Sequence, residues 1–233
     1  MTLAAAVAPL AVYAVAFQTV LYFSLPSRLR TRVAPLVTGL IGASVTLGAA
    51  LIFGPEHIGL VGGDATTIFA WGGVAVVVVS SIGLVMLSRG QIRDRLADQP
   101  IARLGNFDVI TQVFVRIPVF TALIEEAFFR GVLHAALVAL YPAEVAIWLG
   151  AGLFGLWHIG PGVDQALTGA ASVRGRALHT GVIVVATTVA GAFLVWLRIE
   201  TGSIWAPVAV HAVVNMTLAG TAWLAGKRSP VAV

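Results

Sequence analysis

The sequence predicts an all-α membrane protein, a polytopic bundle of about seven transmembrane helices with one further amphipathic helix at the membrane interface. The composition is the first reason, because 59% of the 233 residues are hydrophobic and only 10% are charged, whereas a soluble domain is about 25% charged. The second reason is a series of long, continuously apolar runs, which do not alternate with period two as barrel strands do. A water-soluble globule, a disordered tail and a fibrous repeat are excluded.

The apolar runs define the predicted spans. A helix that crosses a hydrocarbon core of about 30 Å needs about 20 mainly apolar residues. Seven segments meet this requirement, at about 3–23, 33–53, 66–87, 117–140, 143–162, 177–198 and 204–225. The first is expected to remain as a helix, because no Lys or Arg precedes its apolar run and no small-x-small cleavage site follows it.

The basic residues predict the orientation. Alternate loops contain eleven of the 14 Lys and Arg residues, namely Arg28, Arg30, Arg32, Arg89, Arg93, Arg95, Arg103, Arg174, Arg176, Lys227 and Arg228. By the positive-inside rule these loops are cytoplasmic, with the N-terminus outside and the C-terminus inside. The same distribution accounts for the net charge of +4 and the pI near 10.3 without a nucleic-acid partner. The Ala-, Val- and Arg-rich, Lys-poor composition suits a GC-rich bacterium, so we expect the protein in a bacterial plasma membrane.

Residues 101–116 differ from the predicted spans because polar residues recur on one face and apolar residues fill the other. This pattern favours a helix that lies in the cytoplasmic interface, followed by a new helix that begins near Pro118. The alternative is one long tilted helix over 107–140. The chain then divides into N-terminal transmembrane helices (1–100), a catalytic transmembrane core (101–226) and a short cytoplasmic tail (227–233).

Ionisable residues inside a span are costly and usually face the interior of a bundle. The fourth span contains Glu125, Glu126, Arg130 and His134. Glu126 and Arg130 are four residues apart on one helix face and can form an ion pair. Glu125 lies about 100° further round the helix, which places it outside that pairing and leaves it available for chemistry. The alternative is a buried charge network that only joins helices.

Two further spans contribute hydrogen-bonding groups. His158 lies four residues after Phe154 near the end of the fifth span, and His211 and Asn215 lie one turn apart on the seventh. Taken singly, His158 could be a satisfied core histidine, and His211 with Asn215 an interhelical hydrogen-bonded pair. Together with Glu125 they form a hydrolytic constellation. The chain has no cysteine, P-loop, serine elbow or HExxH motif that would indicate another chemistry.

Three motifs then carry a family resemblance: Glu125-Glu126-x-x-x-Arg130, Phe154-x-x-x-His158 and His211-x-x-x-Asn215. In this order, on successive hydrophobic helices, they resemble the CPBP family of CAAX prenyl endopeptidases and bacteriocin-processing or immunity proteins, also called Abi. The first three spans match that family only in being hydrophobic.

The resemblance implies an intramembrane endopeptidase. Glu125 would be the catalytic carboxylate, and His158 would help it orient and deprotonate a water molecule. His211 and Asn215 would stabilise the oxyanion, while Glu126 and Arg130 would be a supporting pair. Both a glutamate-type and a metal-dependent mechanism have been described for the family. We favour the metal-free form and commit to no cofactor, but zinc stays open because Glu125, His158 and His211 could supply three ligands.

Two other functions remain open. A proton-coupled transporter would use the same intramembrane groups as a relay, although the chain has no pair of related halves. A non-catalytic immunity or scaffold protein would not need them for chemistry. Apart from the bilayer, the expected partner is a peptide or protein substrate, either lipid-modified or leader-type. The sequence does not assign the oligomeric state, the roles of the first three spans, or those of His134 and His179.

Overall fold

The computed structural model describes residues 5, 7–13, 16, 18–25, 27–169 and 172–228, and this part of the chain is mostly helical and has no strand. Six of its helical segments are long and apolar enough to cross a membrane. They are Leu36–Phe53, Ala65–Ser88, Asn106–Val138, Ala143–Leu167, Val173–Thr201 and Trp205–Arg228. The predicted all-α, multi-pass fold is therefore confirmed, and the protein is an integral membrane protein.

The first predicted span, 3–23, lies partly outside the described residues. Its described part contains α1 (Val7–Val12) and α2 (Gln18–Ser24), each of which is too short to cross a bilayer. A seventh span therefore stays a prediction. The other six predicted spans coincide with the six helical segments, although the ends of several differ by some residues.

The predicted interface helix over 101–116 has the wrong boundaries. Residues Pro100–Arg103 form a short 3-10 helix, η3. The next helical segment runs from Asn106 to Val138 without interruption. The alternative of one long helix, expected over 107–140, is therefore confirmed with small shifts at both ends.

Pro118 does not begin a new helix. It lies inside η4 (Gln112–Leu123), a stretch in the π-helical register. In an α-helix a proline ring clashes with the carbonyl of residue i−4 and leaves it without a donor. The i→i+5 register of a π-helix changes which carbonyl faces the ring. The helix can therefore continue past Pro118, which a reading based on α-helical periodicity does not anticipate.

The chain forms two compact units, each assembled from two separate stretches. The first comprises Met1–Gly62 and Ile124–Ile204, and the second comprises Gly63–Leu123 and Trp205–Val233. These boundaries are defined by which residues pack together. The predicted division into 1–100, 101–226 and 227–233 is instead a division by function, and it stays a prediction.

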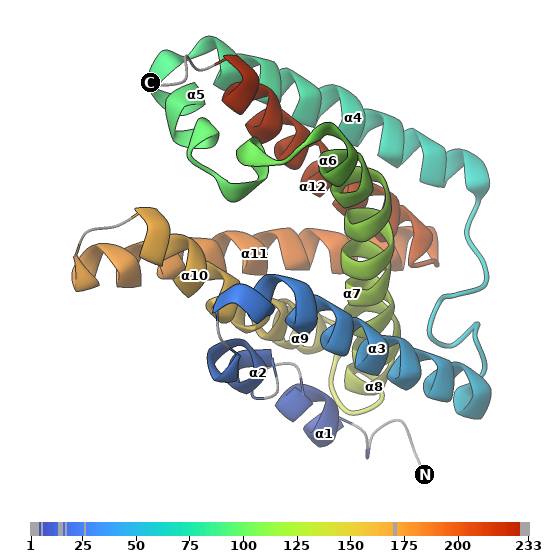
Figure 1. Ribbon diagram of the computed structural model, residues 1–233. Coiled ribbons are helices and arrows are strands. Elements are labelled where there is room, and N and C mark those ends of the chain that lie inside the picture. The colour runs from blue at the N-terminus through green and yellow to red at the C-terminus, as the bar shows by residue number, and fades with distance from the viewer. Residues whose placement is uncertain are drawn as a thin grey trace. The chain divides into compact units, whose positions relative to one another are not determined.

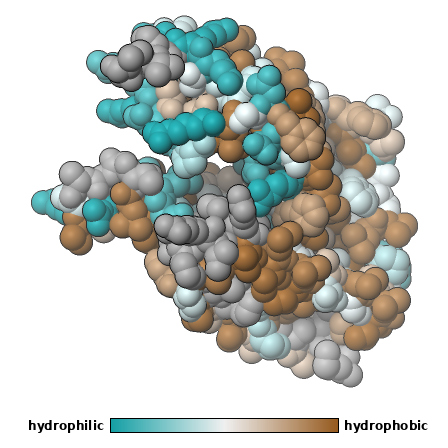
Figure 2. Space-filling view, in the orientation of Figure 1, coloured by the Kyte–Doolittle hydropathy of each residue, from teal (hydrophilic) through white to brown (hydrophobic). Residues whose placement is uncertain are grey.

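The first unit is built around the helices that follow Leu123 (Figure 1). Besides α1 and α2 it contains α3 (Ser27–Phe53), α7 (Ile124–Glu126), η5 (Ala127–Leu133), α8 (His134–Val138), α9 (Ala143–Trp157), α10 (Ile159–Gly169) and α11 (Val173–Thr201). Aromatic side chains from η5 and α9 form its core, including Phe128, Phe129, Phe154 and Trp157. The outer face of α3 is apolar (Figure 2), as expected for a lipid-facing helix.

The second unit is organised by α12 (Trp205–Arg228), which packs against α4 (Ala65–Ser88) and η4. The remaining elements are α5 (Gly90–Ala97), η3 and α6 (Asn106–Thr111). Hydrophilic side chains gather over α5 (Figure 2), which has an exposed, basic sequence. Asp64 caps α4 by accepting a hydrogen bond from the Thr67 backbone N–H at 2.7 Å, and this bond lowers the pKa of the Asp64 carboxyl.

Candidate functional site

A buried ion pair lies at the centre of the first unit. Arg130 Nη1 donates to Glu126 Oε1 at 3.0 Å, and the two side chains are 1% and 0% exposed. Arg130 Nη2 also donates to the Gly191 carbonyl of α11 at 3.2 Å. The guanidinium carbon lies 4.1 Å from the centroid of the Phe154 ring of α9. The predicted pairing of Glu126 with Arg130 is confirmed, and the arginine joins three helices.

Gly191 permits this close approach. A Cβ atom at this position would lie 3.1 Å from Phe154 Cδ1 and 3.3 Å from Arg130 Nη2. Any larger residue at position 191 would therefore clash with both the Arg130 guanidinium and the Phe154 ring. The absence of a side chain on α11 is part of what holds the arginine in place.

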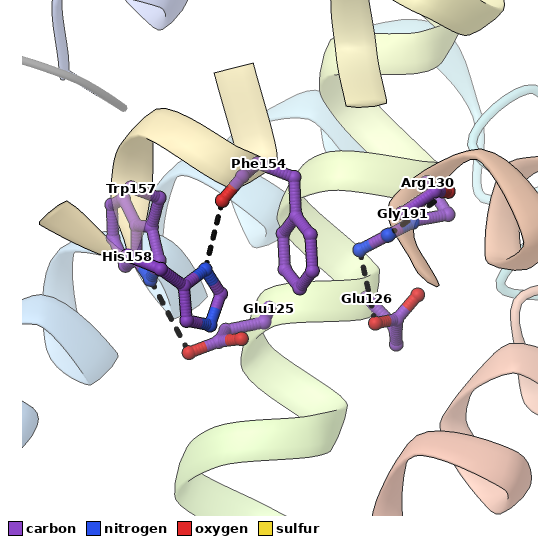
Figure 3. A network of polar contacts seen from close by, with 7 residues as sticks. All are labelled: Glu125, Glu126, Arg130, Phe154, Trp157, His158 and Gly191. Atoms are coloured by element: carbon purple, nitrogen blue, oxygen red, sulfur yellow. Dashed lines mark hydrogen bonds and ion pairs between the residues drawn. The ribbon is translucent and has the colours of Figure 1, made fainter. Parts of the chain in front are cut away.

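Glu125 points away from this pair and meets a different partner (Figure 3). Trp157 Nε1 donates to Glu125 Oε1 at 3.3 Å. The indole is only 6% exposed. It packs edge-on against Phe129, with ring centroids 5.4 Å apart, and at a tilt against Tyr13, at 5.9 Å. The indole is therefore fixed by packing, and through its N–H it fixes one oxygen of the carboxylate.

His158 is the residue after Trp157, at the junction between α9 and α10. Its Nδ1 lies 2.8 Å from the Phe154 carbonyl oxygen. A carbonyl can only accept, so Nδ1 must carry the proton, and in the neutral ring Nε2 then has the acceptor lone pair. In Figure 3 the imidazole and the Glu125 carboxylate face the same region. Phe154 therefore supports both halves of the site, since its ring covers Arg130 and its carbonyl sets the His158 tautomer.

This arrangement brings together two proton acceptors of different kinds. Glu125 provides a carboxylate held by an indole N–H, and His158 provides an imidazole with a fixed tautomer. Both side chains are half-buried, whereas the neighbouring ion pair is closed to water. A water molecule that contacts Glu125 and His158 would meet groups able to orient it and to accept its proton.

The other predicted site residues belong to the second unit or to other helices, and their roles stay predictions. His211 and Asn215 are on α12, in the second unit, where His211 is buried and Asn215 is half-buried. No group of three His, Asp or Glu side chains suited to a metal ion occurs among the described residues. His134 is half-buried on α8, and His179 is exposed on α11.

Trp157 is a candidate site residue that the sequence reasoning missed. Its position gave a usable signal, because it directly precedes a candidate catalytic histidine. A buried indole N–H usually needs a hydrogen-bond acceptor. This requirement predicts an acceptor for Trp157, but no spacing rule identifies that acceptor as Glu125, 32 positions away.

The fold and the site define a multi-pass membrane protein with a buried ion pair on α7 and η5 and a half-buried glutamate and histidine nearby. Residues 108–217 match the model of the family described as type II CAAX prenyl endopeptidase Rce1-like. This stretch includes all three motifs, and the match agrees with the resemblance drawn from them. The family is one of proteases, which makes a peptide the expected class of substrate. No curated protein and no solved structure gave a significant match.

Proposed function

We propose that the protein is an intramembrane endopeptidase that hydrolyses a peptide bond of a membrane-associated substrate, with Glu125 as the general base. The observation that supports this most strongly is the position of Glu125. Its carboxylate accepts from Trp157, next to a histidine whose tautomer is set by the Phe154 carbonyl. The match of residues 108–217 to the model of a protease family supports the same class of reaction.

The proposed reaction begins with a water molecule between Glu125 and His158. Glu125 takes a proton as the water oxygen attacks the scissile carbonyl carbon. The resulting tetrahedral oxygen would accept hydrogen bonds from His211 and Asn215. Each donor to such an oxyanion is worth roughly 3–4 kcal/mol in known cases. Return of the proton to the leaving nitrogen breaks the C–N bond and restores the carboxylate.

Glu126 and Arg130 are positioning residues in this proposal. Their ion pair does not face the water, but it holds Phe154 through the guanidinium and Gly191. The backbone carbonyl of the same phenylalanine orients His158. A change at Arg130 is therefore expected to reach the reacting groups through the position of α9.

Trp157→Phe is expected to lower kcat by about ten- to a hundredfold and to leave KM nearly unchanged. The phenyl ring keeps much of the packing but loses the N–H donor to Glu125, and a hydrogen bond to a charged group is worth about 1.5–3 kcal/mol. Steady-state kinetics on purified protein measures this effect. Trp148→Phe is the matched control, because Trp148 lies on the same helix with its side chain 62% exposed. Equal losses in both variants would remove Trp157 from the site.

A comparison of membrane peptides tests the proposed class of reaction. Cells that produce the protein should contain peptides with new C-termini that cells lacking it do not contain. Purified protein should generate the same termini. Solute or proton flux into proteoliposomes without new termini would instead assign the protein as a transporter.

No step of this proposal is routed through a metal ion. We propose the metal-free form, with Glu125 and His158 as the water-activating groups. Metal analysis of active enzyme tests this choice. Stoichiometric zinc whose removal stops turnover would replace the glutamate-type mechanism.

We further propose that the Arg-rich loops are cytoplasmic, that the N-terminus is outside and the C-terminus inside, and that residues 101–226 form the catalytic core of a bacterial plasma-membrane enzyme. The alternating distribution of basic residues supports this orientation. A lipid-modified C-terminus or a leader peptide would bring the scissile bond to the membrane.

A further inference from the structure

The second unit contains an apolar groove that the proposed catalysis does not use. It lies between α6–η4 on one side and α12 on the other, with a volume of about 540 Å³, within the usual size of a ligand site. Val113 and Phe114 contribute one wall, and Met216 and Leu224 contribute the other. Phe114 is 64% exposed. The groove is therefore open and fits an extended hydrocarbon chain.

Gly220 lines this groove from α12. A Cβ atom added to Gly220 would have no other atom within 4 Å. No helix–helix contact therefore requires the glycine. Its small size keeps the groove open, although glycine in a helix interior costs about 1 kcal/mol relative to alanine.

One end of the groove is basic. At Gly226 a Cβ atom would lie only 2.6 Å from the Ala102 carbonyl oxygen, so η3 and α12 touch backbone to backbone there. The next residue on each element is a cation, Arg103 on η3 and Lys227 on α12, and both are exposed. The two cations therefore extend from backbone segments that are in contact.

Trp223 connects this basic end with the apolar groove. Its ring lines the groove, and its Nε1 donates to the Leu104 carbonyl at 3.1 Å, which fixes the ring. The Lys227 ammonium lies 5.3 Å from the centroid of the same ring. Tryptophan is enriched at the level of the lipid headgroups. The apolar walls, the tryptophan and the cations thus follow the order of acyl chain, glycerol region and phosphate.

We propose that this groove binds one anionic phospholipid, with an acyl chain along α12 and the headgroup phosphate on Arg103 and Lys227. Charge complementarity decides the occupant. An apolar peptide or a second copy of the chain would fill the walls but would leave the two cations unmatched. Basic pockets between transmembrane helices bind anionic headgroups, and both cations lie in the Arg-rich loops proposed to be cytoplasmic. The proposal does not depend on the catalytic activity.

Native mass spectrometry of the full-length protein in detergent tests the proposal, with phosphatidylglycerol and phosphatidylcholine of identical acyl chains as probes. We expect one phosphatidylglycerol to bind about 30-fold more tightly than phosphatidylcholine. This ratio is the gain in affinity for an anionic lipid that two basic side chains provide at a membrane surface. Gly220→Leu should abolish binding of both lipids by filling the groove. Arg103→Gln/Lys227→Gln should lower phosphatidylglycerol binding to the level of phosphatidylcholine.

Two control variants separate these effects from general ones. Gly73→Leu adds the same side chain at an α4 position that likewise has no atom within 4 Å of its Cβ, and it should bind lipid normally. Arg174→Gln removes a charge from another exposed helix end and should preserve the preference. Equal binding of the two lipids, or unchanged binding in Gly220→Leu, would overturn the proposal. Loss of a dimer or a peptide adduct in Gly220→Leu, in place of a lipid adduct, would also overturn it.

Discussion

Glu125→Gln is expected to lower the rate of peptide cleavage by about 10²–10⁴-fold, the contribution of a general base. Glutamine has nearly the same shape, and its amide oxygen can still accept from Trp157 Nε1, which lies 3.3 Å from the native carboxylate. What the variant loses is the ability to take a proton from water. The protein should therefore insert, purify and unfold like the parent while its kcat falls.

The measurement is single-turnover cleavage of a peptide identified in the membrane comparison. Glu144→Gln is the control, because Glu144 is an exposed carboxylate in the first turn of α9. This variant should cleave the peptide at the parental rate. A Glu125→Gln variant as fast as the parent would show that another group activates the water. It would also exclude the proposed role of the Glu125–Trp157 hydrogen bond.

Arg130→Met is expected to destabilise the protein by about 3–5 kcal/mol, the cost of removing one partner of a buried ion pair. The Glu126 carboxylate is 0% exposed and would lose its arginine in a site closed to water. The same substitution removes the guanidinium that lies over the Phe154 ring. Activity should therefore fall as well, because the carbonyl of Phe154 orients His158.

Thermal unfolding in detergent measures this loss. Glu126→Gln/Arg130→Met should recover at least half of the lost stability, because it also removes the buried negative charge. Arg174→Met, which changes an exposed arginine, should unfold like the parent. If the double variant were less stable than Arg130→Met alone, Glu126 would contribute through contacts other than its arginine, and the ion pair would not be the main stabilising element.

The sequence was sufficient for features that depend on composition and on spacing within one helix. Six spans follow from hydropathy, and the Glu126–Arg130 pair follows from a spacing of four residues. The π-helical register around Pro118 was not predictable in this way. It depends on which carbonyl each N–H selects, and tertiary packing influences that choice.

Contacts between helices were equally hidden in the sequence. The donation from Trp157 to Glu125 joins residues 32 positions apart, and that from Arg130 to Gly191 spans 61 positions. No spacing rule connects such residues. The sequence therefore identified the chemical groups at Glu125 and His158, whereas the structure identified what orients them.

Thiol cross-linking tests the central claim most directly, namely that side chains from separate spans meet around one water molecule. The chain has no cysteine, so a His158→Cys/His211→Cys variant contains only the two thiols of interest. Gly72→Cys/Ala209→Cys is the positive control, since a Cβ at Gly72 would lie 3.6 Å from the Ala209 Cβ. The single-cysteine variants His158→Cys and His211→Cys show the product in which the reagent is attached at one end only. A reagent with two thiol-reactive groups that spans about 10 Å, two hydrogen bonds to one water plus the length by which each imidazole exceeds a thiol, should bridge the His158→Cys/His211→Cys pair in membranes. Two unbridged adducts on this pair, with the control pair cross-linked, would contradict the claim.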